Sequence, residues 1–230
     1  MKTLTRLALL SIFLLLSPQP YAQTLDRDAV LDKLVDAYGG EQNLRRMEHV
    51  VQEWDMVAMM SKRHGKDVRV IRIPGQLTVQ LTYPEKVEKR MLDGEQAQVS
   101  FNGSEAFPAT EPQRDAMQLQ LMRLYSPLVL RDKADDVTLT VEGDYHALTL
   151  VEHGVRADYL VNTQDWRIEK VAGTLNMGGG SMRFLTEYSD FRFVDGALMH
   201  HKENKYAGNV NTAMLVLRNL SFGDSPDSMH

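Results

Sequence analysis

The segment QLTVQLTY, residues 76–83, alternates polar and apolar side chains at every position. Successive side chains of a β-strand point to opposite faces, so this pattern predicts a strand with one wet and one apolar face. The same period of two recurs in residues 50–60 and 96–101. Asp93-Gly94, just before the last of these segments, is typical of a tight hairpin turn. Together these segments predict an antiparallel meander.

Further strand patterns occupy the second half of the chain. Glycine-containing turns separate them, among them Gly178-Gly179-Gly180, which we interpret as a hairpin turn rather than a phosphate loop because no lysine and helix follow. The sequence therefore predicts a mainly β (α+β) fold with an antiparallel sheet of about 11 strands, at a spacing typical of a sheet that curls on itself. The predicted strands of this half are residues 137–142, 145–151, 155–161, 166–172, 182–193, 198–206 and 212–220.

Helical patterns open the chain and interrupt the meander. Residues 26–38 and 41–47 are two short helices by their apolar spacing, and Gly39 and Gly40 end the first. A longer helix begins after Thr110, which forms a capping-box pattern with Gln113, and Pro127 bends or ends it. Its apolar stripe comprises Met117, Leu121, Leu124, Tyr125 and Leu128. Inserted mid-meander, this helix is a natural plug for the concave side of a curved sheet.

The N-terminus has the order of a secretory signal peptide. Lys2 and Arg6 precede an apolar run over residues 7–16, and Ala22 follows as a small residue suited to cleavage. We expect residues 1–22 to be the signal peptide. An uncleaved anchor or a buried core helix is the alternative, but the run is shorter than the roughly 20 residues that span a bilayer.

Composition excludes several classes of protein. The chain contains no cysteine, so disulfides, thiolate metal sites and an N-terminal lipidated cysteine are absent. Removing Lys2 and Arg6 lowers the formal charge from −5 to −7, which argues against nucleic acid and against electrostatic adhesion to anionic membranes. The 13 methionines fit either gap-filling in a core or a surface that adapts to variable apolar partners.

Four segments resemble the LolA-like family of periplasmic outer-membrane lipoprotein-sorting proteins. They are the entry helix ending in residues 36–40, the strand and turn of residues 99–103, the leucine-rich mid-chain helix, and residues 187–196, EYSDFRFVDG. The last is the most specific. The sequence departs from the family pattern at Phe107, where the family often has tryptophan, and at His200-His201, where it often has proline.

The resemblance implies a strongly curved, open β half-barrel whose concave face is covered by helices and binds acyl chains. One domain would span residues 23–222, with a flexible tail after it. The expected protein is a periplasmic monomer that needs no cofactor and is not an enzyme. Its partners would be lipid or lipoprotein acyl chains, an inner-membrane transporter and an outer-membrane acceptor, and not nucleic acid.

One-sided alternation facing a methionine-rich helix stripe suggests which residues line the cavity, although plain core is the alternative for each. Acyl burial gains about 0.8 kcal/mol per CH₂, so such a cavity needs no polar contact. The basic segment of residues 61–66 is either a solvated hairpin tip or a docking site for an acidic partner, through Lys62, Arg63 and Lys66. The candidate cavity residues are Trp54, Met56, Leu81, Met91, Phe101, Met117, Leu121 and Tyr125.

The sequence gives little support for a catalytic or metal-binding site. It lacks the nucleophile elbow and the zinc-protease helix motif. The adjacent His200 and His201 cannot chelate one metal together if they lie on a strand, because neighbouring side chains diverge. We therefore favour a carrier of lipid-bearing cargo. A lipid-sensing adaptor is the second hypothesis and a small enzyme for an apolar substrate the third; only a carrier transfers lipid stoichiometrically between membranes.

Overall fold

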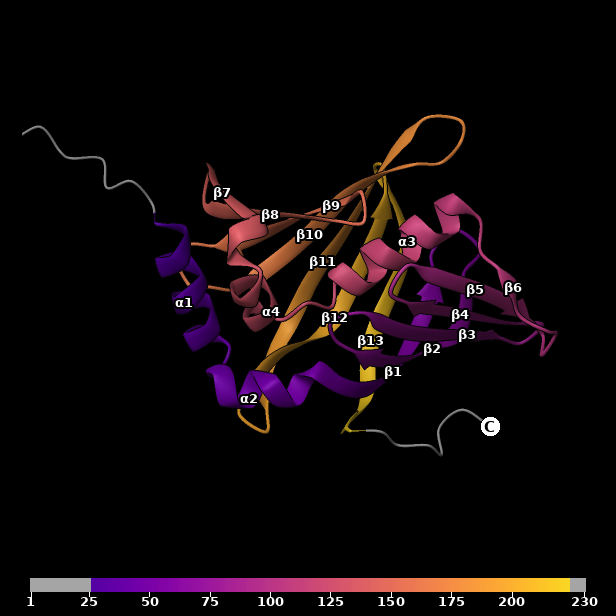
Figure 1. Cartoon of the computed structure of the whole chain (residues 1–230). Coiled ribbons are helices and arrows are strands. Elements are labelled where there is room, and N and C mark those ends of the chain that lie inside the picture. Colours follow the sequence, from indigo (N-terminus) through magenta and orange to yellow (C-terminus); the bar gives the residue numbers. More distant parts are fainter. Residues whose placement is uncertain (1–25, 224–230) are drawn as a thin grey trace, which may run out of the picture.

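The computed structural model describes residues 26–223. The expected signal peptide, residues 1–22, and the tail after Gly223 lie outside the described residues. Within them the chain is β-dominated with a few short helices, as the sequence predicts (Figure 1).

The strands form a single antiparallel sheet of thirteen, in the order β6-β5-β4-β3-β2-β1-β13-β12-β11-β10-β9-β8-β7. Nearly every neighbour in this order is a hairpin, and the closing pair β1–β13 brings the two halves of the chain together. The bounds are β1 (His49–Ala58), β2 (Arg63–Arg72), β3 (Gln76–Tyr83), β4 (Lys86–Asp93), β5 (Gln96–Phe101), β6 (Phe107–Pro108), β7 (Val137–Glu142), β8 (Tyr145–Glu152), β9 (Val155–Asn162), β10 (Ile168–Asn176), β11 (Ser181–Val194), β12 (Ala197–Ala207) and β13 (Val210–Phe222).

The strand count of about 11 was too low, chiefly because β6 is only two residues long and carries no readable alternation. A second correction concerns the basic segment of residues 61–66. The turn after β1 ends at Lys62, with φ +56°, and β2 already begins at Arg63. Arg63 and Lys66 therefore belong to a paired strand and not to a loop.

The helices lie on one side of the sheet and are α1 (Arg27–Ala37), α2 (Glu41–Arg45), the 3₁₀ turns η1 (Arg46–Glu48) and η2 (Ala134–Asp136), α3 (Glu111–Met122) and α4 (Pro127–Asp132). The backbone N–H of Thr110 donates to Gln113 Oε1 at 2.9 Å, which completes the expected capping box at the start of α3. Pro127 ends up in the first turn of a new helix, α4, where its missing N–H costs nothing.

Helix α3 contacts both halves of the sheet. It packs on β3, β4 and β5 on one side and on β9 and β10 on the other. Five strands lie between β3 and β10 in the sheet order. Figure 1 shows α3 between these two groups of strands and α4 closer to α1.

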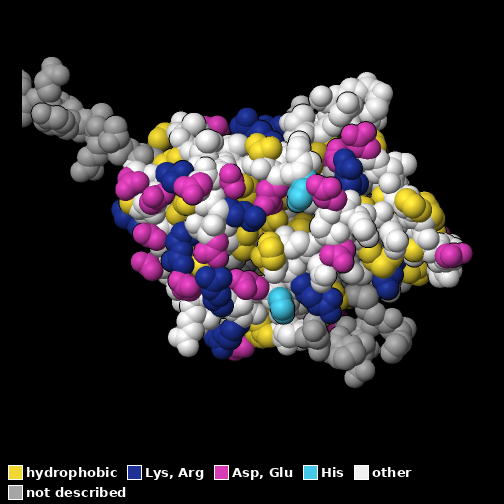
Figure 2. Space-filling view, in the orientation of Figure 1, with side chains coloured by type: hydrophobic (Ala, Val, Ile, Leu, Met, Phe, Trp, Pro, Cys, Tyr) yellow, Lys and Arg dark blue, Asp and Glu magenta, His cyan; other side chains and the backbone are white. Residues whose placement is uncertain are grey.

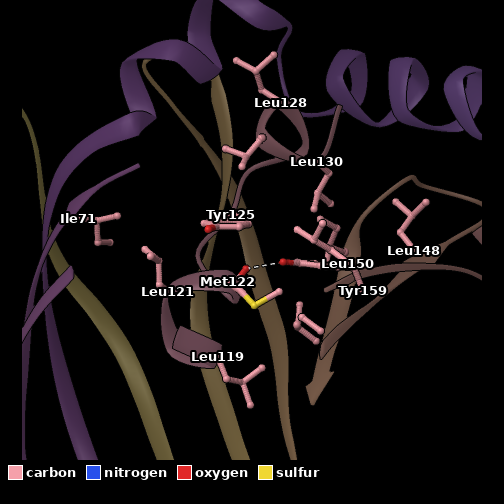
Figure 3. Packing of buried hydrophobic residues seen from close by; sticks show 14 of the residues in the cluster. Ile71, Leu119, Leu121, Met122, Tyr125, Leu128, Leu130, Leu148, Leu150 and Tyr159 are labelled. Carbon is pink, nitrogen blue, oxygen red and sulfur yellow. Dashed lines mark hydrogen bonds between the residues drawn. The ribbon is translucent and has the colours of Figure 1, made fainter. Parts of the chain in front are cut away.

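The main core lies where α1, α3 and α4 meet the strands. Leu119, Leu121 and Met122 of α3 and Leu148 and Leu150 of β8 are almost completely buried, and Figure 3 shows them converging with Tyr159. Gly173 on β10 makes room for this packing, because a Cβ there would come within 2.5 Å of Leu119 Cδ1. The absence of a side chain at Gly173 therefore lets α3 pack closely on β10.

Candidate functional site

A cavity of about 80 Å³ lies between the sheet and the segment that links α3 to α4. All four linker residues, Arg123, Leu124, Tyr125 and Ser126, line it. Most of the remaining lining is apolar and comes from both halves of the chain: Tyr38, Leu44, Met47, Val50, Ile71, Ile73, Ile168, Val171, Tyr188, Leu198 and Met199. Apolar side chains of the strands and entry helices thus form the floor of the cavity, and the linker, residues 123–126, forms its roof.

Tyr125 fastens this roof to both halves of the sheet. Its hydroxyl donates to Glu152 Oε2 of β8 at 2.6 Å, and the carbonyl oxygen of Pro74, between β2 and β3, lies 3.1 Å away. Burial, followed by the bond to the Glu152 carboxylate, raises the pKa of Tyr125, so the phenol stays protonated as a donor. Lys133, just after α4, holds the other oxygen of Glu152 at 2.6 Å.

Two further tyrosines hold the end of α3. The last carbonyls of a helix have no partner within the helix and need one from outside. Tyr159 of β9 donates to the carbonyl of Met122 at 2.8 Å, a bond drawn in Figure 3, and Tyr188 of β11 donates to that of Arg123 at 2.9 Å. The roof is therefore held by a few side-chain hydrogen bonds, each of which a movement of the linker would break.

Ion pairs tie α4 to the entry helices at the surface. Arg45 of α2 lies 3.1 Å from both Glu41 and Asp132, and Arg131 of α4 lies 2.5 Å from Glu41. Figure 2 shows side chains of both charges over α1 and α2, and apolar side chains at the centre of the same face. Exposed pairs of this kind are weak, so they position the helices more than they stabilise them.

A buried charged cluster lies on the same side of the sheet, next to the cavity. Arg69 of β2 binds Asp67 at 2.8 Å and Glu203 of β12 at 2.7 Å, and Lys205 lies 3.3 Å from Glu203. The Trp54 ring covers the Arg69 guanidinium at 4.9 Å. His200, a lining residue of the cavity, reaches Glu203 with its Nε2 at 3.3 Å. The sequence pattern does not reveal this cluster, because charged residues on an inward face have the same spacing as those on the solvent-exposed face of a strand.

Four of the predicted cavity residues share the helix-facing side of the sheet. Leu81 pairs with Asp67 and Glu88, which places it on the side of the charged cluster, and Phe101 pairs with Glu88. Trp54 and Met56 lie on this side too, in a small second core with Leu215 and Leu217. None of these four lines the 80 Å³ cavity.

Met91 lies on the opposite side of the sheet. It pairs with Thr78 and Gln98, whereas its neighbour Leu92 pairs with Leu77 and points into the main core. Met91 lines a shallow outer groove with Val70 and Arg72. Met91 therefore does not line the 80 Å³ cavity, and its binding of acyl chains stays a prediction.

The helix residues fare differently from one another. Tyr125 lines the 80 Å³ cavity, and its contact with an acyl chain stays a prediction. Leu121 is buried in the main core, and Met117 lines a separate hollow of about 160 Å³ with Glu88, Arg90 and Val99. Their binding of acyl chains stays a prediction, as does partner binding by Lys62, Arg63 and Lys66; all three cations are exposed, and Arg63 pairs with Glu85.

This fold, an antiparallel sheet with an interrupted helix on one face, resembles that of two solved structures. The chain is similar to a LolA superfamily protein from Nitrosomonas europaea, with 14% identity, a TM-score of 0.56 and coverage of 87% of this chain and 95% of the other. It is also similar to a putative outer membrane lipoprotein-sorting protein domain from Vibrio parahaemolyticus, with 8% identity, a TM-score of 0.56 and coverage of 88% and 96%. The resemblance seen in the sequence is thereby confirmed at the level of the fold.

Sequence comparisons add nothing to this: no family model and no curated protein matches the chain. At these identities the likeness concerns the fold, and the function has to come from the site. None of the helices within residues 26–223 has the length and apolarity to cross a membrane. Nor do those residues bring three or more metal-ligating side chains together.

Two of the segments that carry the resemblance touch each other. Gly39, at the end of the entry helix, packs so closely on the β11–β12 turn that a Cβ would lie 1.9 Å from the carbonyl oxygen of Gly196. The backbone N–H of Leu198 donates to the carbonyl of Tyr38 at 3.0 Å beside this contact. The two segments thus form one joint that fixes the entry helices against the sheet, at the edge of the cavity.

Proposed function

We propose that this chain is a periplasmic carrier or chaperone that shelters acyl chains of lipids or lipoproteins during transfer toward the outer membrane. One domain, residues 23–222, would do this, with the sheet curved as a half-barrel around α3. The contacts of α3 with β3 and β10 support the curvature, since a flat sheet would separate these strands by roughly six spacings of 4.8 Å, more than a helix can bridge.

The observation that carries the proposal is the apolar cavity under a roof held by side-chain hydrogen bonds. At about 80 Å³ it is smaller than the roughly 150 Å³ that accommodates benzene, so it cannot take a whole acyl chain as it stands. Binding therefore requires the linker and α3 to lift. Lifting breaks the bonds of Tyr125, Tyr159 and Tyr188 and exposes apolar surface that an acyl chain can cover.

The energetics favour such an exchange. Each buried CH₂ contributes about 0.8 kcal/mol, so ten methylenes offset the loss of two hydrogen bonds of about 1 kcal/mol each and of the Tyr125–Glu152 bond, about 1.5–3 kcal/mol because its acceptor is charged. The closed form is then the form without cargo. In the open form, acyl chains cover the apolar face of the sheet that α3 covers in the closed form.

The test is native mass spectrometry of the protein purified from its own cell envelope, followed by solvent extraction. Co-purifying lipid or acylated peptide supports the proposal, and stoichiometric transfer of labelled lipid from donor to acceptor vesicles supports the carrier role. A mass free of lipid, with no uptake on addition of lipid, contradicts it. Binding without transfer would instead favour the adaptor hypothesis, with the exposed Lys62 and Lys66 as its docking residues.

A further inference from the structure

The roof of the cavity carries Arg123, a partly buried cation with two N–H groups that lack a hydrogen-bond partner within residues 26–223. Arg123 directly follows α3, and its Nε and Nη2 atoms are buried without a hydrogen-bond partner among the described residues. Burial lowers the pKa of Arg123, but a guanidinium stays charged in proteins. Burying two N–H groups of a cation without partners is costly, so their retention calls for a function.

The nearby carboxylates are already engaged. Glu203 accepts two hydrogen bonds from Arg69, and Glu48, which also lines the cavity, binds Arg45 at 3.1 Å. Tyr188 donates its hydrogen bond to the backbone carbonyl of Arg123 and not to the guanidinium. No described acidic side chain forms an ion pair with Arg123 within 4.0 Å.

A second unpartnered group lies three residues on. Ser126 precedes α4 at the position where serine usually caps a helix with its side chain. Here the side chain makes no such bond, and its Oγ is buried without a partner among the described residues. Two hydrogen-bonding groups, one of them cationic, therefore line one apolar cavity from the same linker.

We propose that Arg123 and Ser126 bind the anionic headgroup of a single-chain amphiphile, and that the headgroup is a carboxylate, as in a free fatty acid. A carboxylate matches a guanidinium in geometry and charge, and the serine hydroxyl supplies a third hydrogen bond. The two unpartnered nitrogens, Nε and Nη2, form one edge of the guanidinium and match the two oxygens of a carboxylate. The inference rests on the proposed acyl-chain binding and adds the chemistry of the head.

The experiment compares three twelve-carbon ligands by isothermal titration calorimetry on the full mature chain: dodecanoate, dodecanol and dodecyl phosphate. Wild type should bind dodecanoate at least tenfold more tightly than dodecanol and more tightly than dodecyl phosphate. Arg123→Gln should lose at least tenfold for dodecanoate and stay within about twofold for dodecanol. Ser126→Ala, which leaves the charge unchanged, should lose a few-fold for dodecanoate alone.

Arg114→Gln is the matched control, because it removes an arginine of α3 that pairs at the surface with Asp115. It should bind all three ligands as wild type does. Thermal melts check that each variant folds, and Arg123→Lys, which keeps the charge, replaces Arg123→Gln if that variant does not.

The possible failures are distinguishable. If wild type binds neither dodecanoate nor dodecanol, the proposed acyl-chain function fails. If it binds both alike and neither the Arg123 variant nor Ser126→Ala changes this, only the headgroup assignment is overturned. Preference for dodecyl phosphate, lost on changing Arg123, would overturn the carboxylate and assign a phosphate headgroup.

Discussion

Arg69 and Glu203 face each other through two parallel hydrogen bonds, Nη1 to Oε1 at 2.7 Å and Nη2 to Oε2 at 2.9 Å. Their side chains are 1% and 2% exposed. Because β1 and β13 lie between β2 and β12 in the sheet, the pair reaches across two strands. It ties the two halves of the chain together beneath the roof of the cavity.

We expect Glu203→Gln to lower the free energy of unfolding by about 3–5 kcal/mol, since it leaves the buried Arg69 with too little negative charge. Urea unfolding followed by circular dichroism measures this. Asp55→Asn is the matched control: it breaks an exposed pair with Arg218 and should cost at most about 1 kcal/mol. Equal losses in the two variants would show that the buried pair has no special role.

Acid should weaken the same pair. Burial alone would raise the pKa of Glu203, but the charges of Arg69 and Lys205 and the bond from His200 outweigh it and hold that pKa well below its ordinary value of 4.5. A depressed folded-state pKa contributes stability that is complete above 4.5 and is lost as pH falls from there through the folded-state value. Urea titrations from pH 6 to 3 should show this loss in wild type and a shallower slope in Glu203→Gln; parallel curves would refute it.

Tyr125→Phe should make the cavity easier to open. The change removes the hydrogen bond to Glu152 while keeping the ring, at a cost of about 1.5–3 kcal/mol because the acceptor is charged. We expect faster uptake of a fluorescent fatty acid in stopped-flow measurements. Tyr145→Phe removes a similar bond to Glu169, at 2.9 Å, between two side chains that do not line the cavity, and should leave uptake unchanged. Uptake at the wild-type rate in both variants would mean that the Tyr125 hydrogen bond does not hold the cavity closed.

Sequence periodicity located the strands well but misjudged their faces where charges point inward. On β4 the inward residues include Glu88 and Arg90, which neutralise each other at 2.7 Å, so the apolar Met91 was placed inside although it lies outside. On β2, Asp67 and Arg69 are inward for the same reason. The alternation of a strand shows which residues are polar, but it does not show that two charged residues form an ion pair and are buried together.

The position of the cavity could not be predicted from the sequence either, for a geometric reason. The apolar stripe of the mid-chain helix predicted contact with the sheet, and that contact is real for Leu121. Yet the cavity lies under the linker after the helix, where Arg123 and Ser126 break the apolar pattern. The gap depends on where α3 ends and α4 begins, and on tyrosines that arrive from strands far along the chain.

Gly39→Ala should destabilise the joint between the entry helix and the β11–β12 turn by about 3 kcal/mol or more. The new Cβ would overlap the Gly196 carbonyl oxygen, and φ at position 39 is +103°, so a clash is added to backbone strain. Gly94→Ala is the control, with φ +57° and open space around it, and should cost only about 1–2 kcal/mol. Thermal unfolding of both variants separates the cost of the clash from the cost of the backbone strain. Similar losses of stability in the two variants would mean that the close contact is not needed.

Leu124→Trp should fill the cavity of the closed form, hold the linker against lifting and so weaken acyl binding without removing any polar group. Leu124 lines the cavity and is only partly buried, so the larger indole has room to extend into the space of about 80 Å³. We expect stability close to that of wild type and at least tenfold weaker binding of dodecanol, which has no charged head for Arg123 to hold. Leu139→Trp, at a partly buried leucine of β7 outside the cavity lining, should bind dodecanol normally. If folded Leu124→Trp protein still takes up dodecanol with wild-type affinity, the acyl chain enters elsewhere, and the 160 Å³ hollow beside Met117 becomes the next candidate.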